Sequence, residues 1–138
     1  MSDDDNGPDW RGYGVDQAVV EQWVRTRFND KIMDSIDERV RRVAEEAIEL
    51  MQAESRDKTL AREEAHKLVD RVFDNPPGKP EQESGGVIVT MLAYCAARNL
   101  RFDKLAGVEI TRIMESDPQT SGHKHNFKVD PRIAPRPE

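Results

Sequence analysis

The sequence has few of the features that mark secreted or membrane proteins. Cys95 is the only cysteine, so an intrachain disulfide is impossible, and its apolar surroundings in the sequence predict a buried, inert thiol. No stretch approaches the roughly 20 apolar residues that a membrane-spanning helix needs. The start of the chain has neither the basic nor the apolar region of a secretory signal. We therefore expect a soluble, cytoplasmic protein that has no membrane partner.

Positive charge is also scarce. The chain has 21 Lys and Arg residues against 27 Asp and Glu, which gives a formal net charge of −6. No stripe of Lys and Arg is present to neutralise successive phosphates, so a nucleic-acid polymer is excluded as the ligand, whereas a single nucleotide carried with a cation is compatible. A length of 138 residues predicts one domain with one small core, or a core shared between subunits.

Apolar residues recur at helical spacing in five segments. In the first, which runs from Val19 to Phe28, Asp16 is a suitable N-cap. In the second, Ser35 and Glu38 have the spacing of a capping box, and the helix is expected to end near Glu54. Both starts are predicted from side chains that can satisfy the free N–H groups of a first helical turn.

The remaining three segments follow the same logic. The third contains Ala65 to Phe73 and stops at the sequence NPPG. Pro80 suits the first turn of the fourth, which is apolar nearly all round and is therefore predicted to be the most buried helix. Asp103 is the expected cap of the fifth. The pattern predicts an all-α domain over 15–116, between a flexible N-terminal segment (1–14) and an extended or disordered C-terminal arm (117–138).

Three carboxylates cluster in the second segment. At 100° per residue, Glu45, Glu46 and Glu49 share one face of a helix, where their oxygens could bind a hard cation such as Mg²⁺. A solvated acidic face is the more ordinary explanation of such a cluster. However, no lysines stand at i+4 to relieve the repulsion, and Arg42 is the only near basic residue on that face. The apolar stripe of this helix, which includes Val40, lies on the opposite side and is expected to face the core.

A fourth carboxylate, Glu83, precedes Ser84, Gly85 and Gly86 at the start of the fourth segment. Glycine in a helix costs about 1 kcal/mol relative to alanine, so two in succession indicate a close approach. The approaching group is either another helix or a ligand, and the residues themselves favour neither.

These two motifs carry a resemblance to a known family. The string EEAIEL at 45–50, followed downstream by ESGGVIVTMLAYCA at 83–96, resembles the MazG-like branch of the all-α nucleoside triphosphate pyrophosphohydrolases, over about Val19 to Met114. The resemblance implies a four-helix-bundle-like core of that type. It also implies that Glu45, Glu46, Glu49 and Glu83 bind Mg²⁺, with Mn²⁺ as the alternative ion.

The sequence departs from the family at Gly86, where the family usually has aspartate. We hypothesise that Asp70 substitutes for the absent ligand, and Asp74 is the next candidate. The alternative is that Asp70 is a solvated residue near a helix end. The departure leaves open whether the second acidic motif still supports turnover.

The reaction implied is attack of water at the α-phosphorus of a nucleoside triphosphate, giving a monophosphate and pyrophosphate. Glu46 or Glu49 is the expected base for the water's proton. Arg42, and after it Arg39 and Lys79, are the candidates for binding the triphosphate. As an alternative, Arg42 is an internal salt-bridge partner of a nearby glutamate.

The predicted substrate is a small-molecule nucleotide, either a canonical, deoxy or damaged nucleotide or a related one such as an alarmone. The expected assembly is a homodimer or a dimer of dimers. Two other functions are compatible with the sequence. One is a nucleotide- or metal-binding regulatory module without turnover, and the other is a structural helical dimerisation protein whose acidic face is solvated.

Overall fold

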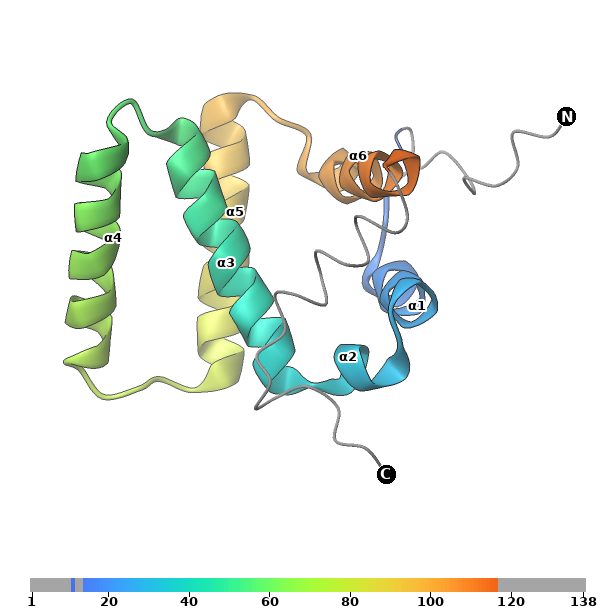
Figure 1. Ribbon diagram of the computed structural model, residues 1–138, viewed down its shortest axis with the longest axis horizontal. Coiled ribbons are helices and arrows are strands. Elements are labelled where there is room, and N and C mark those ends of the chain that lie inside the picture. The colour runs from blue at the N-terminus through green and yellow to red at the C-terminus, as the bar shows by residue number, and fades with distance from the viewer. Residues whose placement is uncertain (1–10, 12–13, 117–138) are drawn as a thin grey trace, which may run out of the picture. The chain divides into compact units, whose positions relative to one another are not determined.

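Six α-helices make up most of the chain that the structure describes. The computed structural model describes residue 11 and residues 14–116, and no strand occurs among them. The helices, shown in Figure 1, are α1 (Gln17–Arg27), α2 (Asp30–Asp34), α3 (Ile36–Glu54), α4 (Lys58–Phe73), α5 (Pro80–Arg98) and α6 (Phe102–Glu115). The all-α prediction is confirmed for these residues. The predicted C-terminal arm and all of the predicted N-terminal segment except residues 11 and 14 lie outside the described part.

The chain divides into two compact units. The terminal unit comprises residues 1–38 and 90–138, and its described part contains α1, α2, the second half of α5 and α6. The middle unit comprises residues 39–89 and contains most of α3, all of α4 and the first half of α5. Every residue that the sequence predicts as part of the site lies in the middle unit.

The predicted helix starts are largely confirmed. The Asp16 carboxylate accepts a hydrogen bond from the Val19 N–H at 2.9 Å, and the Ser35 hydroxyl oxygen accepts one from the Glu38 N–H at 3.2 Å. Pro80 is the first residue of α5. At Asp16 and Ser35 a side chain accepts a hydrogen bond from a backbone N–H of the first turn. At Pro80 the proline has no N–H that needs a partner.

Two predictions about helix starts require correction. The five-residue helix α2, capped by Asn29, was not predicted, because so short a segment shows no apolar periodicity. Asp103 is not the cap of α6, which begins at Phe102 with Arg101 in the cap position. The Arg101 guanidinium instead donates to both oxygens of the Asp103 carboxylate, at 3.0 and 2.7 Å, so that carboxylate is occupied within the first turn.

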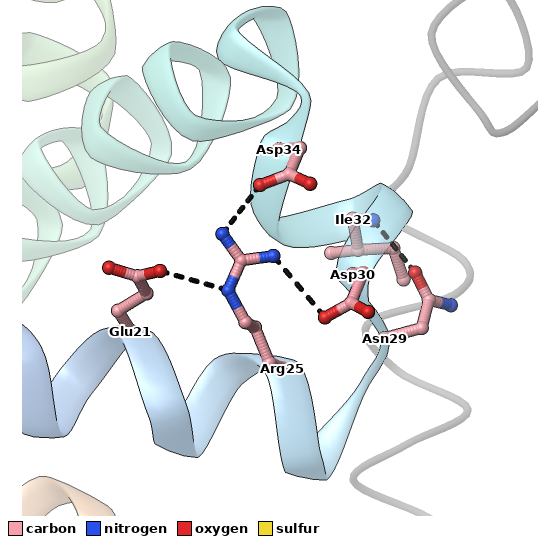
Figure 2. A network of polar contacts seen from close by, with 6 residues as sticks. All are labelled: Glu21, Arg25, Asn29, Asp30, Ile32 and Asp34. Carbon is pink, nitrogen blue, oxygen red and sulfur yellow. Dashed lines mark hydrogen bonds and ion pairs between the residues drawn. The ribbon is translucent and has the colours of Figure 1, made fainter.

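Arg25 of α1 pairs with three carboxylates, one on α1 and two on α2, as Figure 2 shows. Its guanidinium donates to Glu21 at 2.9 Å within α1, and to Asp30 at 3.2 Å and Asp34 at 2.6 Å in α2. These hydrogen bonds raise the pKa of Arg25, with Asp34 as the largest cause, and the same guanidinium lowers the pKa of Asp34. The short helix is therefore held by charge-assisted hydrogen bonds that require ionised aspartates.

The Arg25–Asp34 pair predicts a specific loss of stability in acid. Because the pKa of Asp34 is lowered in the folded state from 3.8, its contribution is present above that pH and is lost as the pH falls through the lowered pKa. In Asp34→Asn, we expect the free energy of unfolding to be lower near neutral pH and to fall less between pH 4 and 2 than in wild type. Urea unfolding followed by circular dichroism measures both. Equal slopes in the two proteins would contradict the prediction.

The terminal unit has a small core. Its buried apolar residues are Val24, Ile32, Cys95 and Ile110. The predicted burial of Cys95 is thus confirmed. At the end of α5, Asn99 adopts a left-handed conformation (φ 57°), and the Leu100 N–H donates to the Cys95 carbonyl at 2.8 Å. This reversal satisfies a free carbonyl at the end of the helix.

The middle unit is different, because none of residues 39–89 is buried. Every residue from Arg71 to Thr90 is exposed, a stretch that includes the whole first half of α5. The prediction that this helix is the most buried is therefore wrong for the single chain. A helix that is apolar all round needs neighbours on all sides, and α3 and α4 do not surround it. Among the described residues, none of the helices combines the length and apolar character that crossing a bilayer requires.

Candidate functional site

Helix α3 places the three clustered carboxylates on adjacent turns. Glu45 and Glu49 lie one turn apart and are half-buried, whereas Glu46 is exposed. A solvated acidic face would leave all three in water. Two of these carboxylates are thus partly removed from solvent, which is costly for an anion unless a cation stands nearby.

One such cation is Arg42, which pairs with the first carboxylate. Its guanidinium donates from Nη1 to Oε2 of Glu45 at 2.8 Å, and the two side chains are 11% and 30% exposed respectively. The alternative that Arg42 is an internal salt-bridge partner is therefore confirmed for Glu45. Arg39, about one turn earlier, is also half-buried. Of the two guanidinium groups, only that of Arg42 is shown to pair with a carboxylate of the cluster.

The opposite face of α3 carries its apolar residues, which are exposed as far as Ala47, whereas Leu50 and Met51 near the end of the helix are half-buried. Val40 is 62% exposed and Val43 is 52% exposed, and Ala44 and Ala47, which follow them, are also exposed. We call these four residues the aliphatic face. The prediction that this stripe faces the core is wrong for the single chain. On α3, Glu45 and Glu49 are thus half-buried, whereas the four residues of the aliphatic face are exposed.

Glu83 stands in the first turn of α5, where it is exposed. Its carboxylate lies against Gly78 in the loop before the helix, so closely that a Cβ on Gly78 would collide with it. Gly78 is a contact of the site that sequence patterns did not indicate. Its place in the NPPG turn, five residues before Glu83, is the signal that could have done so.

The two glycines that follow Glu83 face open space. No described atom lies within 4 Å of where a Cβ would stand on Gly85 or on Gly86. Tight packing against another helix of the same chain therefore does not explain them. Of the two, Gly86 shares a helix face with Glu83 because it follows at i+3, so the open space at Gly86 lies on the side of α5 that carries Glu83.

The remaining candidates lie around the loop between α4 and α5. Asp70 is exposed near the end of α4, in agreement with the alternative of a surface residue at a helix end. Asp74 follows as the C-cap, with its N–H donating to the Asp70 carbonyl at 3.0 Å. Lys79 is exposed immediately before α5. Among the described residues, no hydrogen bond or ion pair joins these three side chains to the carboxylates of α3.

The middle unit thus contains acidic residues on two helices and basic residues beside them. Among residues 11 and 14–116, however, no three His, Cys, Asp or Glu side chains lie close enough together to hold a metal ion. No family model, curated protein or solved structure matches the chain. Chemically, the arrangement offers hard oxygen donors for a divalent cation and guanidinium and ammonium groups for phosphate.

Proposed function

We propose that the chain is a Mg²⁺-dependent nucleoside triphosphate pyrophosphohydrolase with a MazG-like four-helix core. Glu45, Glu46, Glu49 and Glu83 are the proposed metal ligands, and Asp70 is the proposed substitute for the aspartate that Gly86 replaces. Arg42, Arg39 and Lys79 are the proposed triphosphate contacts. The sequence resemblance supplies these roles, and all eight side chains belong to the middle unit.

One observation carries the proposal beyond the resemblance. Helix α3 keeps Glu45 and Glu49 half-buried while Val40 and Val43 are exposed. A helix without a functional charged face gains free energy by the reverse orientation, because burying apolar area is favourable and burying carboxylates is costly. The orientation found is the one that a cation and a polyphosphate would stabilise.

The chemical type of the proposed donors suits the proposed cation. Carboxylate oxygens are the ligands that Mg²⁺ prefers in proteins, and Mg²⁺ commonly takes only one or two carboxylates together with substrate phosphates. When bound, the cation supplies positive charge against the phosphate oxygens of the substrate. The open space at Gly86, which shares a helix face with Glu83, leaves room for those phosphates.

The chain's own residues supply the proton transfer and the orientation of the substrate. The Glu49 or Glu46 carboxylate takes a proton from the attacking water while the oxygen of that water forms a bond to the α-phosphorus. The bond from that phosphorus to the bridging oxygen breaks, and pyrophosphate leaves with the electron pair. Guanidinium groups of Arg39 and Arg42 and the ammonium of Lys79 hold the phosphate oxygens, since these groups match their geometry and charge.

A panel of nucleoside triphosphates tests the proposal. We expect wild-type protein with Mg²⁺ to release pyrophosphate and the matching monophosphate from at least one canonical, deoxy or oxidised nucleotide, and to stop when EDTA is added. Guanosine tetraphosphate is included to represent alarmones. Release of orthophosphate instead of pyrophosphate, or no release from any member, would contradict the proposed reaction.

A regulatory module without turnover is the second candidate, and Gly86 is the residue that favours it. Loss of one carboxylate from the second motif weakens cation binding without removing the other donors. For this function we expect Mg²⁺ and a nucleotide together to raise the melting temperature, because a ligand of the native state stabilises it by mass action. Stabilisation without product would favour the module over the enzyme.

The contact between Gly78 and Glu83 gives a prediction about the proposed site. Gly78→Ala places a methyl group where the Glu83 carboxylate lies. Because that carboxylate ends a flexible side chain, we expect it to move with a change in unfolding free energy of less than about 1 kcal/mol. Pyrophosphate release should fall by about tenfold or more, since misplaced catalytic groups lose rate steeply. Gly85→Ala, whose Cβ meets no described atom, is the control for an added methyl group.

A further inference from the structure

The ion pair between Arg42 and Glu45 joins two side chains that have separate roles in the proposed site. Nη1 of Arg42 lies 2.8 Å from Oε2 of Glu45, three residues further along α3. Glu45 is a proposed ligand of the cation, and Arg42 is a proposed contact of the triphosphate. Each side chain thus already holds a partner of the same charge sign as its proposed ligand.

This pair is more sheltered from water than a comparable pair on α6. Arg112 and Glu109 also stand three residues apart, and their side chains are 65% and 55% exposed. Those of Arg42 and Glu45 are 11% and 30% exposed. Water and salt screen an exposed pair strongly and a partly buried pair much less. Separating the pair on α3 is therefore the more costly of the two unless each member receives a new partner.

A divalent cation and the guanidinium compete for the Glu45 carboxylate. Mg²⁺ binds a carboxylate oxygen at roughly 2.1 Å, so at Oε2 it would stand no more than about 5 Å from Nη1 of Arg42. Like charges this close repel one another, and more strongly where water is partly excluded. For the same reason of charge, the Glu45 carboxylate and a phosphate compete for Arg42.

We propose that Arg42 changes partner when the site is loaded. Its guanidinium passes from the Glu45 carboxylate to a phosphate of the nucleotide, whose oxygens suit its N–H donors equally well, and the cation takes its place on Glu45. The inference rests on the proposed function, because that function assigns the two ligands to these side chains.

The exchange makes the two ligands depend on each other. Without nucleotide, the cation must displace a guanidinium from Glu45. Without cation, a nucleotide that attracts Arg42 leaves a half-buried carboxylate with one positive charge fewer beside it. Each ligand therefore strengthens the binding of the other, and by the same factor.

Titration of Mn²⁺ alone tests the first half of the exchange. Electron paramagnetic resonance reports the free ion in the presence of wild type, Arg42→Gln or Arg112→Gln, with no nucleotide added. We expect Arg42→Gln to bind Mn²⁺ about tenfold more tightly than wild type, because the cation no longer displaces a hydrogen-bonded guanidinium. Arg112→Gln removes the same charge from a pair of the same spacing and should bind Mn²⁺ as wild type does.

Glu45→Gln tests the second half, and it keeps the proposal testable where Arg42→Gln does not fold. The probe is the α,β-methylene analogue of the triphosphate that wild type hydrolyses best, or of ATP if none is hydrolysed. In EDTA, we expect calorimetry to show that Glu45→Gln binds the probe at least about threefold more tightly than wild type, because no carboxylate holds Arg42. With Mg²⁺ the order should reverse, since the variant lacks a proposed cation ligand. Glu63→Gln, an exposed residue of α4, should match wild type in both conditions.

The outcomes separate this inference from the function on which it rests. If Arg42→Gln binds Mn²⁺ no more tightly than wild type, the exchange is overturned and the proposed cation site remains. The same holds if the order of wild type and Glu45→Gln does not reverse between EDTA and Mg²⁺. Binding of Mn²⁺ by none of the proteins would overturn both the exchange and the proposed function. Both expected results without any release of pyrophosphate would support the exchange in a module without turnover.

Discussion

Glu49→Gln is expected to lower the rate of pyrophosphate release by at least about 100-fold while leaving the helix content unchanged. The amide keeps the size of the side chain but cannot take a proton from water, and general base catalysis contributes roughly 10²- to 10⁴-fold. It also loses the charge with which a carboxylate binds a cation. A steady-state assay on whichever nucleotide wild type hydrolyses best measures the effect.

The control is Glu63→Gln, an exposed glutamate on α4 that belongs to none of the proposed roles. Its rate should stay within about twofold of wild type, as expected for a surface substitution away from the site. A Glu49→Gln rate within tenfold of wild type would remove Glu49 from the catalytic machinery. Glu46→Gln, tested in parallel, then shows whether the exposed neighbour is the base instead.

Ile110→Ala is expected to lower the free energy of unfolding by about 2–5 kcal/mol. Ile110 is 4% exposed and is one of four buried apolar residues of the terminal unit, so truncation leaves a cavity in addition to the lost transfer free energy. Urea unfolding followed by circular dichroism measures the change. A loss this large is a substantial fraction of the stability of a small domain.

Val108→Ala provides the comparison for Ile110→Ala. It lies two residues away on α6 but is 45% exposed, so its effect should stay within about 0.5 kcal/mol. If the two substitutions lower the free energy of unfolding by the same amount, Ile110 does not belong to a buried core of the terminal unit.

Helix positions could be predicted from the sequence because their signals are local. Asp16, Ser35 and Pro80 each act on the turn that they begin, and a side chain three residues from its partner needs no knowledge of the rest of the fold. The limits of local signals appear at α2, which is too short for periodicity, and at Asp103, whose carboxylate is occupied by Arg101.

Burial could not be predicted in the same way. The apolar stripe of α3 was expected to face the core, and the structure exposes Val40 and Val43 instead. An amphipathic pattern says that two faces differ, but which face is covered depends on what surrounds the helix. For the candidate site, sequence placed Glu45, Glu46 and Glu49 on one helix face. It did not give the pairing of Glu45 with Arg42 specifically, nor the contact of Glu83 with Gly78.

The most direct test of the account is whether Glu49 and Glu83 bind a divalent cation. Mn²⁺, which replaces Mg²⁺ in such sites, is titrated into wild type, Glu49→Gln, Glu83→Gln and Glu63→Gln in the presence of a non-hydrolysable nucleoside triphosphate. Electron paramagnetic resonance reports the free ion. We expect wild type and Glu63→Gln to bind Mn²⁺ alike, and Glu49→Gln and Glu83→Gln to bind it at least about tenfold more weakly. Equal binding by all four proteins would contradict it.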